Sequence, residues 1–185
     1  MSGRVAEGPG TLVVVAGLSG SGKSFFLSSL PDSPSRRDRL NLTPNFFETA
    51  KNEVEMLGAA RFMGKEETCL IHVQIPRNEG GWARVEWKKL VLSARSVTLV
   101  LIVPKRVTLL RQIFLRARNE KDPRYFRQHF IKYLSHWVND RHREFILDFF
   151  GFVIPARCFL YRSGRLVSAP NDQSALVSEV ERLYL

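Results

Sequence analysis

The sequence lacks any apolar run long enough to cross a lipid bilayer, and its first ten residues lack the apolar centre of a signal peptide. These absences argue against membrane-spanning and secreted classes, and we therefore expect a cytoplasmic protein. We expect residues 1–10 to form a flexible N-terminal lead. Residues 11–185 are expected to form one domain, because a chain of this length can bury a sizeable core.

Cysteine is also scarce, with two residues in the whole chain, Cys69 and Cys158. Both stand inside apolar, strand-like runs, and no second cysteine or histidine follows at the spacing of metal ligands. We therefore expect neither a disulfide nor a cysteine-ligated metal site. Both residues are predicted to be buried thiols.

Acidic residues are outnumbered, since 18 Asp and Glu stand against 28 Lys and Arg and give a net charge of +10. Between Lys105 and Arg143 there are eleven Lys and Arg and three acidic residues, so most of the excess lies in this segment. Such a charge suits a polyanionic ligand, either the phosphates of a nucleotide or a nucleic acid. The alternative is that these residues form a solvated helix face.

What the sequence does contain is a regular alternation of apolar runs and amphipathic segments. Apolar runs predict strands from Thr11 onward, at 40–42, at 68–75, at 97–103 and at 156–161, with a turn at Ser163-Gly164. Helical spacing predicts helices up to Leu30, at 45–57, at 82–94, at 105–118, from Pro123 to a stop at Gly151, and at 172–185. This alternation predicts a three-layer α/β/α fold with a mostly parallel five-stranded sheet.

The strongest motif lies between the first strand and the first helix. It matches G-x-x-x-x-G-K-[ST] in the residues Gly17, Leu18, Ser19, Gly20, Ser21, Gly22, Lys23 and Ser24. Glycines let the backbone curl so that successive N–H groups form an anion nest, and the helix start adds the positive end of its dipole. Lys23 is predicted to bridge the β- and γ-phosphates, and Ser24 to ligate Mg²⁺. At these residues the chain resembles the P-loop NTPase superfamily.

Missing motifs narrow the class of P-loop protein. The chain has no N-K-x-D motif for guanine, and its one D-x-x-G sequence, Asp148–Gly151, ends a helix. Both facts argue against a GTPase. The loop form G-x-x-G-[SA]-G-K-[ST] and the chain length resemble the branch of nucleoside, nucleotide and small-metabolite kinases. This resemblance implies a kinase-like domain over 11–185 that uses ATP and Mg²⁺.

A second similarity to this branch covers residues 97–126, where a strand and an arginine-ended helix precede a lid. The resemblance implies a lid around 116–127, in which Arg116, Arg118 and Arg124 are catalytic residues that meet the transferring phosphoryl group. A guanidinium suits this role because its fork matches the equatorial oxygens of the phosphoryl group. Arginines also occur at helix ends for structural reasons.

The chain departs from the family pattern in one respect. P-loop enzymes usually carry a carboxylate at the end of an inner strand, whereas the strand at 68–75 carries His72 and Gln74. His72 is either a core histidine or a catalytic group that accepts a substrate proton or orients water. Asp38 and Glu79 are the candidate carboxylates for Mg²⁺ or for a catalytic base.

Two functions fit these observations. The first is an ATP-dependent phosphotransferase whose small, anionic, hydroxyl- or phosphate-bearing acceptor binds between Arg36–Asp38, Arg77–Trp82 and the helix after Thr43. The second is a nucleotide-gated regulatory NTPase, in which the basic helix Pro123–Arg143 binds an acidic protein or RNA. The spacing of Phe126, Phe130, Tyr133 and Trp137 is that of a core stripe, which favours the first function.

Overall fold

The computed structural model describes residues 10–18, 20–42, 47–49, 68–75, 90–119, 124, 127, 130 and 137–184. The elements follow the chain in the order β1 (Thr11–Gly17), α1 (Lys23–Ser28), α2 (Pro34–Leu40), β2 (Phe47–Thr49), β3 (Thr68–Gln74), β4 (Ser96–Ile102), α5 (Arg106–Asn119), α7 (Trp137–Phe150), β5 (Arg157–Arg162), β6 (Arg165–Ala169) and α8 (Gln173–Tyr184). None of the helices described is both long and apolar enough to cross a membrane.

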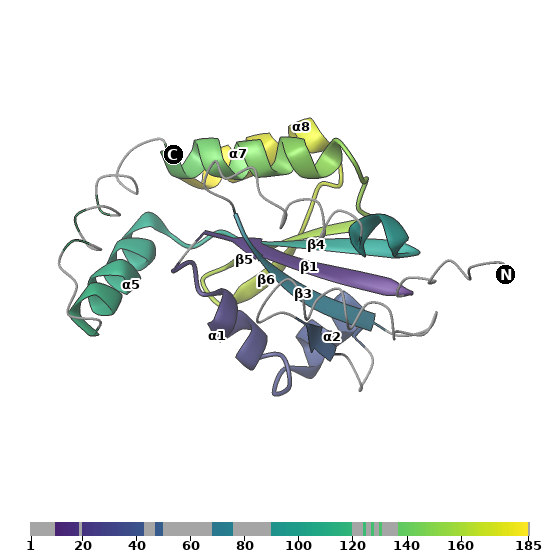
Figure 1. Cartoon of the computed structure of the whole chain (residues 1–185), viewed down its shortest axis with the longest axis horizontal. Helices are drawn as coiled ribbons and strands as arrows, with labels where there is room; N and C mark the ends of the chain where they lie inside the picture. Colours follow the sequence, from purple (N-terminus) through teal and green to yellow (C-terminus); the bar gives the residue numbers. More distant parts are fainter. Residues whose placement is uncertain are drawn as a thin grey trace, which may run out of the picture.

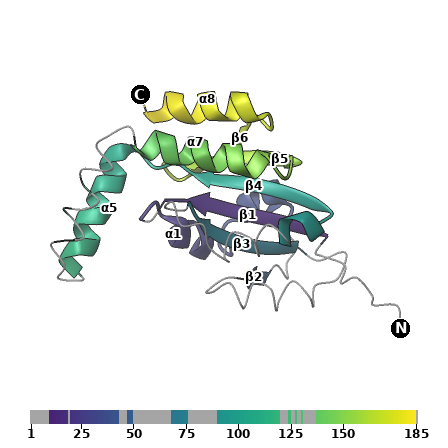
Figure 2. The ribbon, with the colours of Figure 1, turned by 45° about the horizontal axis from the view of Figure 1, so that its top comes forward.

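The strands form one sheet in the order β2-β3-β1-β4-β5-β6, in which β6 alone of the described strands runs antiparallel to its neighbour. Helices α7 and α8 cover one face of the sheet, and α1 and α2 cover the other (Figure 1, Figure 2). Central strand β1 is buried over its whole length after Thr11, because a parallel strand between two helix layers has no solvated face. The predicted three-layer α/β/α class is confirmed, and the sheet has one strand more than expected.

The additional strand, β6, follows β5 through a two-residue turn. Ser163 and Gly164 have positive φ values of 50° and 80°, and Arg162 pairs with Arg165 across the turn. Positive φ at both central positions belongs to a turn whose twist matches that of antiparallel strands. The turn was predicted at these residues. The strand was not, because its five residues carry only the weak alternating pattern of an edge.

Two predictions in the range 40–57 are wrong. Residues 40–42 are not a strand, because Pro34 starts helix α2 and the helix ends only at Asn41, which takes φ 53°. The edge strand is instead β2, which pairs in parallel with 69–71 of β3 and contradicts the predicted helix over 45–57. Pairing with β3 outweighs the helical spacing at these residues. The rest of that predicted helix lies outside the described residues.

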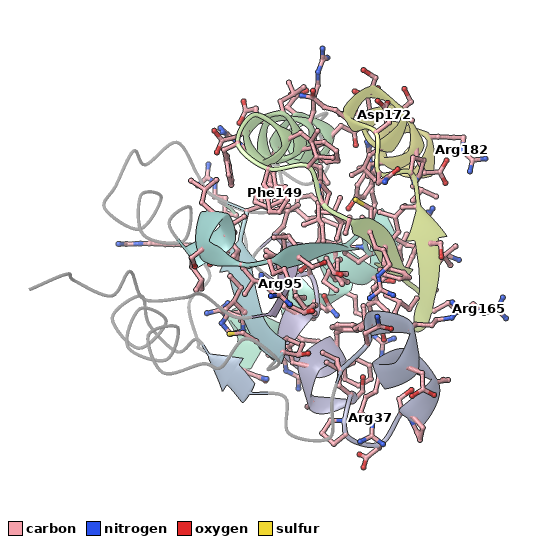
Figure 3. All side chains as sticks on the ribbon, turned by 90° about the vertical axis from the view of Figure 1, so that its right-hand side faces the viewer. Arg37, Arg95, Phe149, Arg165, Asp172 and Arg182 are labelled. Carbon is pink, nitrogen blue, oxygen red and sulfur yellow. The ribbon has the colours of Figure 1, made fainter. Side chains whose placement is uncertain are left out.

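Other predicted elements are confirmed. The helices at 105–118 and 172–185 are α5 and α8, and the strands at 68–75, 97–103 and 156–161 are β3, β4 and β5. The helical pattern that stops at Gly151 ends in α7, whose Phe149 points toward the sheet (Figure 3). Of the predicted aromatic stripe that leads into α7, half-buried Phe130 is described, and the side chains of the other three residues lie outside the description. Both cysteines are free and buried, as predicted.

Arg36 connects α2 to the β5–β6 turn. Its guanidinium donates to the hydroxyl of Ser29 at 2.6 Å and to the carbonyl of Gly164 at 2.9 Å, and it lies 5.4 Å from the ring centre of Tyr161. Through these three contacts the guanidinium links helix α2 to the sheet. Arg36 therefore has a structural role on the side of α2 where the sequence suggested an acceptor site.

We expect Arg36→Ala to lower the free energy of unfolding by about 1–2 kcal/mol, because it removes two hydrogen bonds and a cation–π contact. Chemical denaturation measures this loss. Arg95→Ala removes the same charge from an exposed loop residue and should change stability by less than about 0.5 kcal/mol. Equal losses in the two variants would contradict a structural role for Arg36.

Candidate phosphate-binding site

The glycine-rich segment forms a tight loop between β1 and α1. The amide of Ser21 donates to the carbonyl of Leu18 at 3.1 Å, and Gly20 and Gly22 take φ values of 73° and 95°. A residue with a side chain is strained at such φ values, so the turn itself requires glycine at both positions. Ser19 lies outside the described residues.

Gly17, the first glycine of the loop, is required by close packing. A Cβ at this position would lie 2.6 Å from the Oγ of Ser21 and 3.0 Å from the Cβ of Ile102 at the end of β4. A side chain at Gly17 would therefore push the loop away from the sheet. The loop lies on the carboxyl ends of β1 and β4, the edge at which parallel α/β sheets bind ligands.

Helix α5 packs against the loop from another side. Ile113 Cγ1 lies 3.9 Å from the position of a Cβ on Gly20, and Gln112 Nε2 lies 3.6 Å from that of a Cβ on Gly22. Figure 2 shows α5 at the edge of the sheet where α1 begins. Gln112 and Arg116 are one turn apart, so both side chains lie on the face of α5 next to the loop.

A cavity of about 370 Å³ lies between the loop, β3 and α5. Its lining consists of Gly20, Ser21, Gly22, Lys23, Ser24, His72, Gln74, Gln112 and Arg116. Two of these side chains are cationic, and none of the described lining residues is a carboxylate. The cavity therefore suits an anion with many acceptor oxygens, such as a chain of phosphates.

Lys23 is folded over the loop. Its Nζ donates to the carbonyl of Gly17 at 2.7 Å and to that of Leu18 at 2.9 Å. Burial of the ammonium lowers the pKa of Lys23 from 10.5 to about 8. The two bonds hold the loop in its curled form, and an anionic ligand would compete with both carbonyls for the ammonium.

Of the predicted catalytic residues, Lys23, His72 and Arg116 line this one cavity. On β3, half-buried His72 is opposite Val15, and exposed Gln74 is opposite Gly17 at the start of the loop. The inner strand therefore presents an imidazole and an amide beside the loop.

Other candidates lie elsewhere. Asp38 is exposed on α2, Arg118 is exposed near the end of α5, and the helical residue Arg124 is exposed as well. These three are not among the residues that line the cavity. Glu79 lies outside the described residues. Gln112 was missed by the sequence analysis, although its position four residues before Arg116 on an amphipathic helix is a signal that could have found it.

The lining fits a magnesium ion bound together with a nucleotide. The Ser24 hydroxyl lines the cavity, and the amide of Gln74 belongs to the same lining. Mg²⁺ takes oxygen ligands and keeps several waters, so a hydroxyl and phosphate oxygens are suitable partners. Among the residues described, no group of three or more His, Cys, Asp or Glu could hold a metal ion.

Comparisons with known proteins bear on the fold. No protein-family model matches the chain, and a search of curated proteins finds no significant match. Among solved structures, the chain is similar to one described in work on the PezAT chromosomal toxin–antitoxin system of Streptococcus pneumoniae. The TM-score is 0.57 and the identity 12%, over 100% of this chain and 81% of that chain. At this identity, the likeness concerns the fold alone.

We expect the ammonium of Lys23 to titrate near pH 8 in the folded protein, because burial disfavours its charged form. The measurement is the pH dependence of the Lys23 side-chain NMR signal, assigned by its loss in Lys23→Met. The unfolded chain keeps the ordinary value of 10.5, so it binds more protons between pH 8 and 10.5. The free energy of unfolding should therefore rise with pH across this window relative to Lys23→Met. Titration of Lys23 near 10.5 would contradict its burial.

Proposed function

We propose that the protein is an ATP-dependent phosphotransferase, a kinase that acts on a small hydroxyl- or phosphate-bearing acceptor. The observation that carries the proposal is the placement of Lys23, Ser24 and Arg116 around one cavity beside a glycine-rich loop. Phosphoryl transfer depends mainly on positioning and on neutralisation of charge, and this lining supplies both. In this proposal residues 11–185 act as one domain, with residues 116–127 as its lid.

The proposed roles follow from the place of each residue. Lys23 exchanges its bonds to the loop carbonyls for phosphate oxygens, whose negative charge raises its pKa again. Ser24 would hold Mg²⁺ through its hydroxyl, and the metal and ATP, when bound, would supply the activated phosphoryl group. The guanidinium of Arg116 neutralises charge on the phosphoryl oxygens.

We propose that the acceptor enters beside β3. His72 and Gln74 line that side of the cavity, and an imidazole can accept the proton of a hydroxyl near neutral pH. Arg36 was expected to bind an anionic acceptor, but its guanidinium is held by Ser29 and Gly164. An anionic acceptor would instead be attracted by Arg116.

ATP turnover tests the proposal. We expect the protein to consume ATP only when Mg²⁺ and a suitable acceptor are both present. In Lys23→Ala the rate should fall by about 100-fold or more, because a charge that stabilises the transition state is lost. An acceptor screen that follows ATP loss and product mass measures this. A screen that finds only acceptor-independent hydrolysis, or no ATP consumption, would contradict the kinase assignment.

Two arginines on α5 provide a matched test of the lid. Arg116→Ala should lower kcat by about 10- to 1000-fold, because Arg116 lines the cavity and acts on charge in the transition state. Arg111→Ala removes an equal charge from an exposed position on the same helix and should change kcat by less than about twofold. Steady-state kinetics compare the two variants. Equal kcat values would exclude Arg116 from the chemical step.

A further inference from the structure

Gln112 is a polar residue of the cavity to which the proposed function gives no role. It lies on α5 one turn before Arg116, and its Nε2 lies 3.6 Å from the position of a Cβ on Gly22. Its Oε1 is buried and accepts no hydrogen bond from any residue that the structure describes. Buried polar atoms are almost always paired, so an unpaired amide oxygen at a ligand cavity indicates a contact made by the ligand.

The neighbours of Gln112 define the ligand group that can make this contact. The loop amides, the ammonium of Lys23 and the guanidinium of Arg116 are hydrogen-bond donors, which suit phosphate oxygens. An ionised phosphate oxygen is itself an acceptor and cannot bond to an amide oxygen. The Oε1 of Gln112 therefore suits an N–H or O–H group of the ligand.

We propose that Gln112 determines ligand specificity by accepting, through Oε1, a hydrogen bond from an N–H or O–H group of the bound nucleotide complex. The inference rests on the proposed function, since it requires a phosphate-bearing ligand in this cavity. Two groups have the required chemistry: the exocyclic amine of adenine, and a hydroxyl or water beside the phosphates. Guanine presents a carbonyl oxygen where adenine presents its amine, so contact with the amine would also select ATP over GTP.

The test is the affinity of wild type, Gln112→Met and Asn119→Met for ATP, GTP and inorganic tripolyphosphate, measured by calorimetry. Methionine keeps the length and helix propensity of glutamine but lacks its acceptor oxygen. Asn119 is the matched control, because its amide is exposed at the end of the same helix. We expect Gln112→Met to weaken ATP binding roughly tenfold, equivalent to about 1.4 kcal/mol, and Asn119→Met to leave it unchanged.

The three ligands distinguish the two donor groups. A loss confined to ATP, together with a wild-type preference for ATP over GTP, assigns the contact to the adenine amine. An equal loss for ATP and tripolyphosphate assigns it to a hydroxyl or water beside the phosphates. Unchanged affinities in Gln112→Met and in a second variant, Gln112→Ala, would overturn the proposal.

Thermal unfolding separates this contact from a structural role. Because Oε1 has no partner among the described residues, Gln112→Met should keep or raise the Tm of the ligand-free protein and reduce only the increase caused by ATP. A fall in ligand-free Tm that accounts for the weaker binding would assign Gln112 a structural role and overturn the proposal. Wild-type protein that binds neither ATP nor tripolyphosphate would instead contradict the proposed function.

Discussion

The contact of Gly17 with the end of β4 is the constraint on which the rest of the site depends. A Cβ at Gly17 would lie 2.6 Å from the Oγ of Ser21 and 3.0 Å from the Cβ of Ile102, so the loop would have to shift. The absence of a side chain lets the loop lie directly on the strand ends. That position brings the ammonium of Lys23 over its own loop carbonyls and lets α5 pack against Gly20 and Gly22. The cavity is the space that these contacts leave.

Several arginines of the chain serve the fold. On the α2 side of the sheet, Arg36 and Arg39 donate to main-chain carbonyls of the β5–β6 hairpin, and Arg157 returns a bond of 2.9 Å to the carbonyl of Arg39. A guanidinium can link several carbonyls at once because its donors are arranged in a rigid fork. The net charge of +10 therefore includes arginines that are engaged in the fold. Among the described residues that line the cavity, Lys23 and Arg116 are the cationic side chains.

The sequence could predict those parts of the fold and site that depend on neighbours along the chain. Strand β1, its loop and strands β3 and β4 carry unbroken apolar runs or a defined spacing, so they were predicted correctly. Strand β2 was not predicted, because it forms through its pairing with β3. Helix α2 was not predicted, because the apolar residues at its end were interpreted as a short strand. The structural role of Arg36 depends on packing between distant segments, which no local pattern reports. Gln112 differs, because its place one turn before Arg116 on the same helix is a local signal.

The bonds of Lys23 to the carbonyls of Gly17 and Leu18 also bear on which anions the site can select. These carbonyls act as an intramolecular competitor that is always present at high effective concentration. Chloride, or a single phosphate, would have to displace both bonds of Lys23 and would form few new bonds in return. A polyphosphate gains bonds along the whole loop and to Arg116, so it can offset the displacement. In the proposed function, the site would thus discriminate by the number of phosphates as well as by their charge.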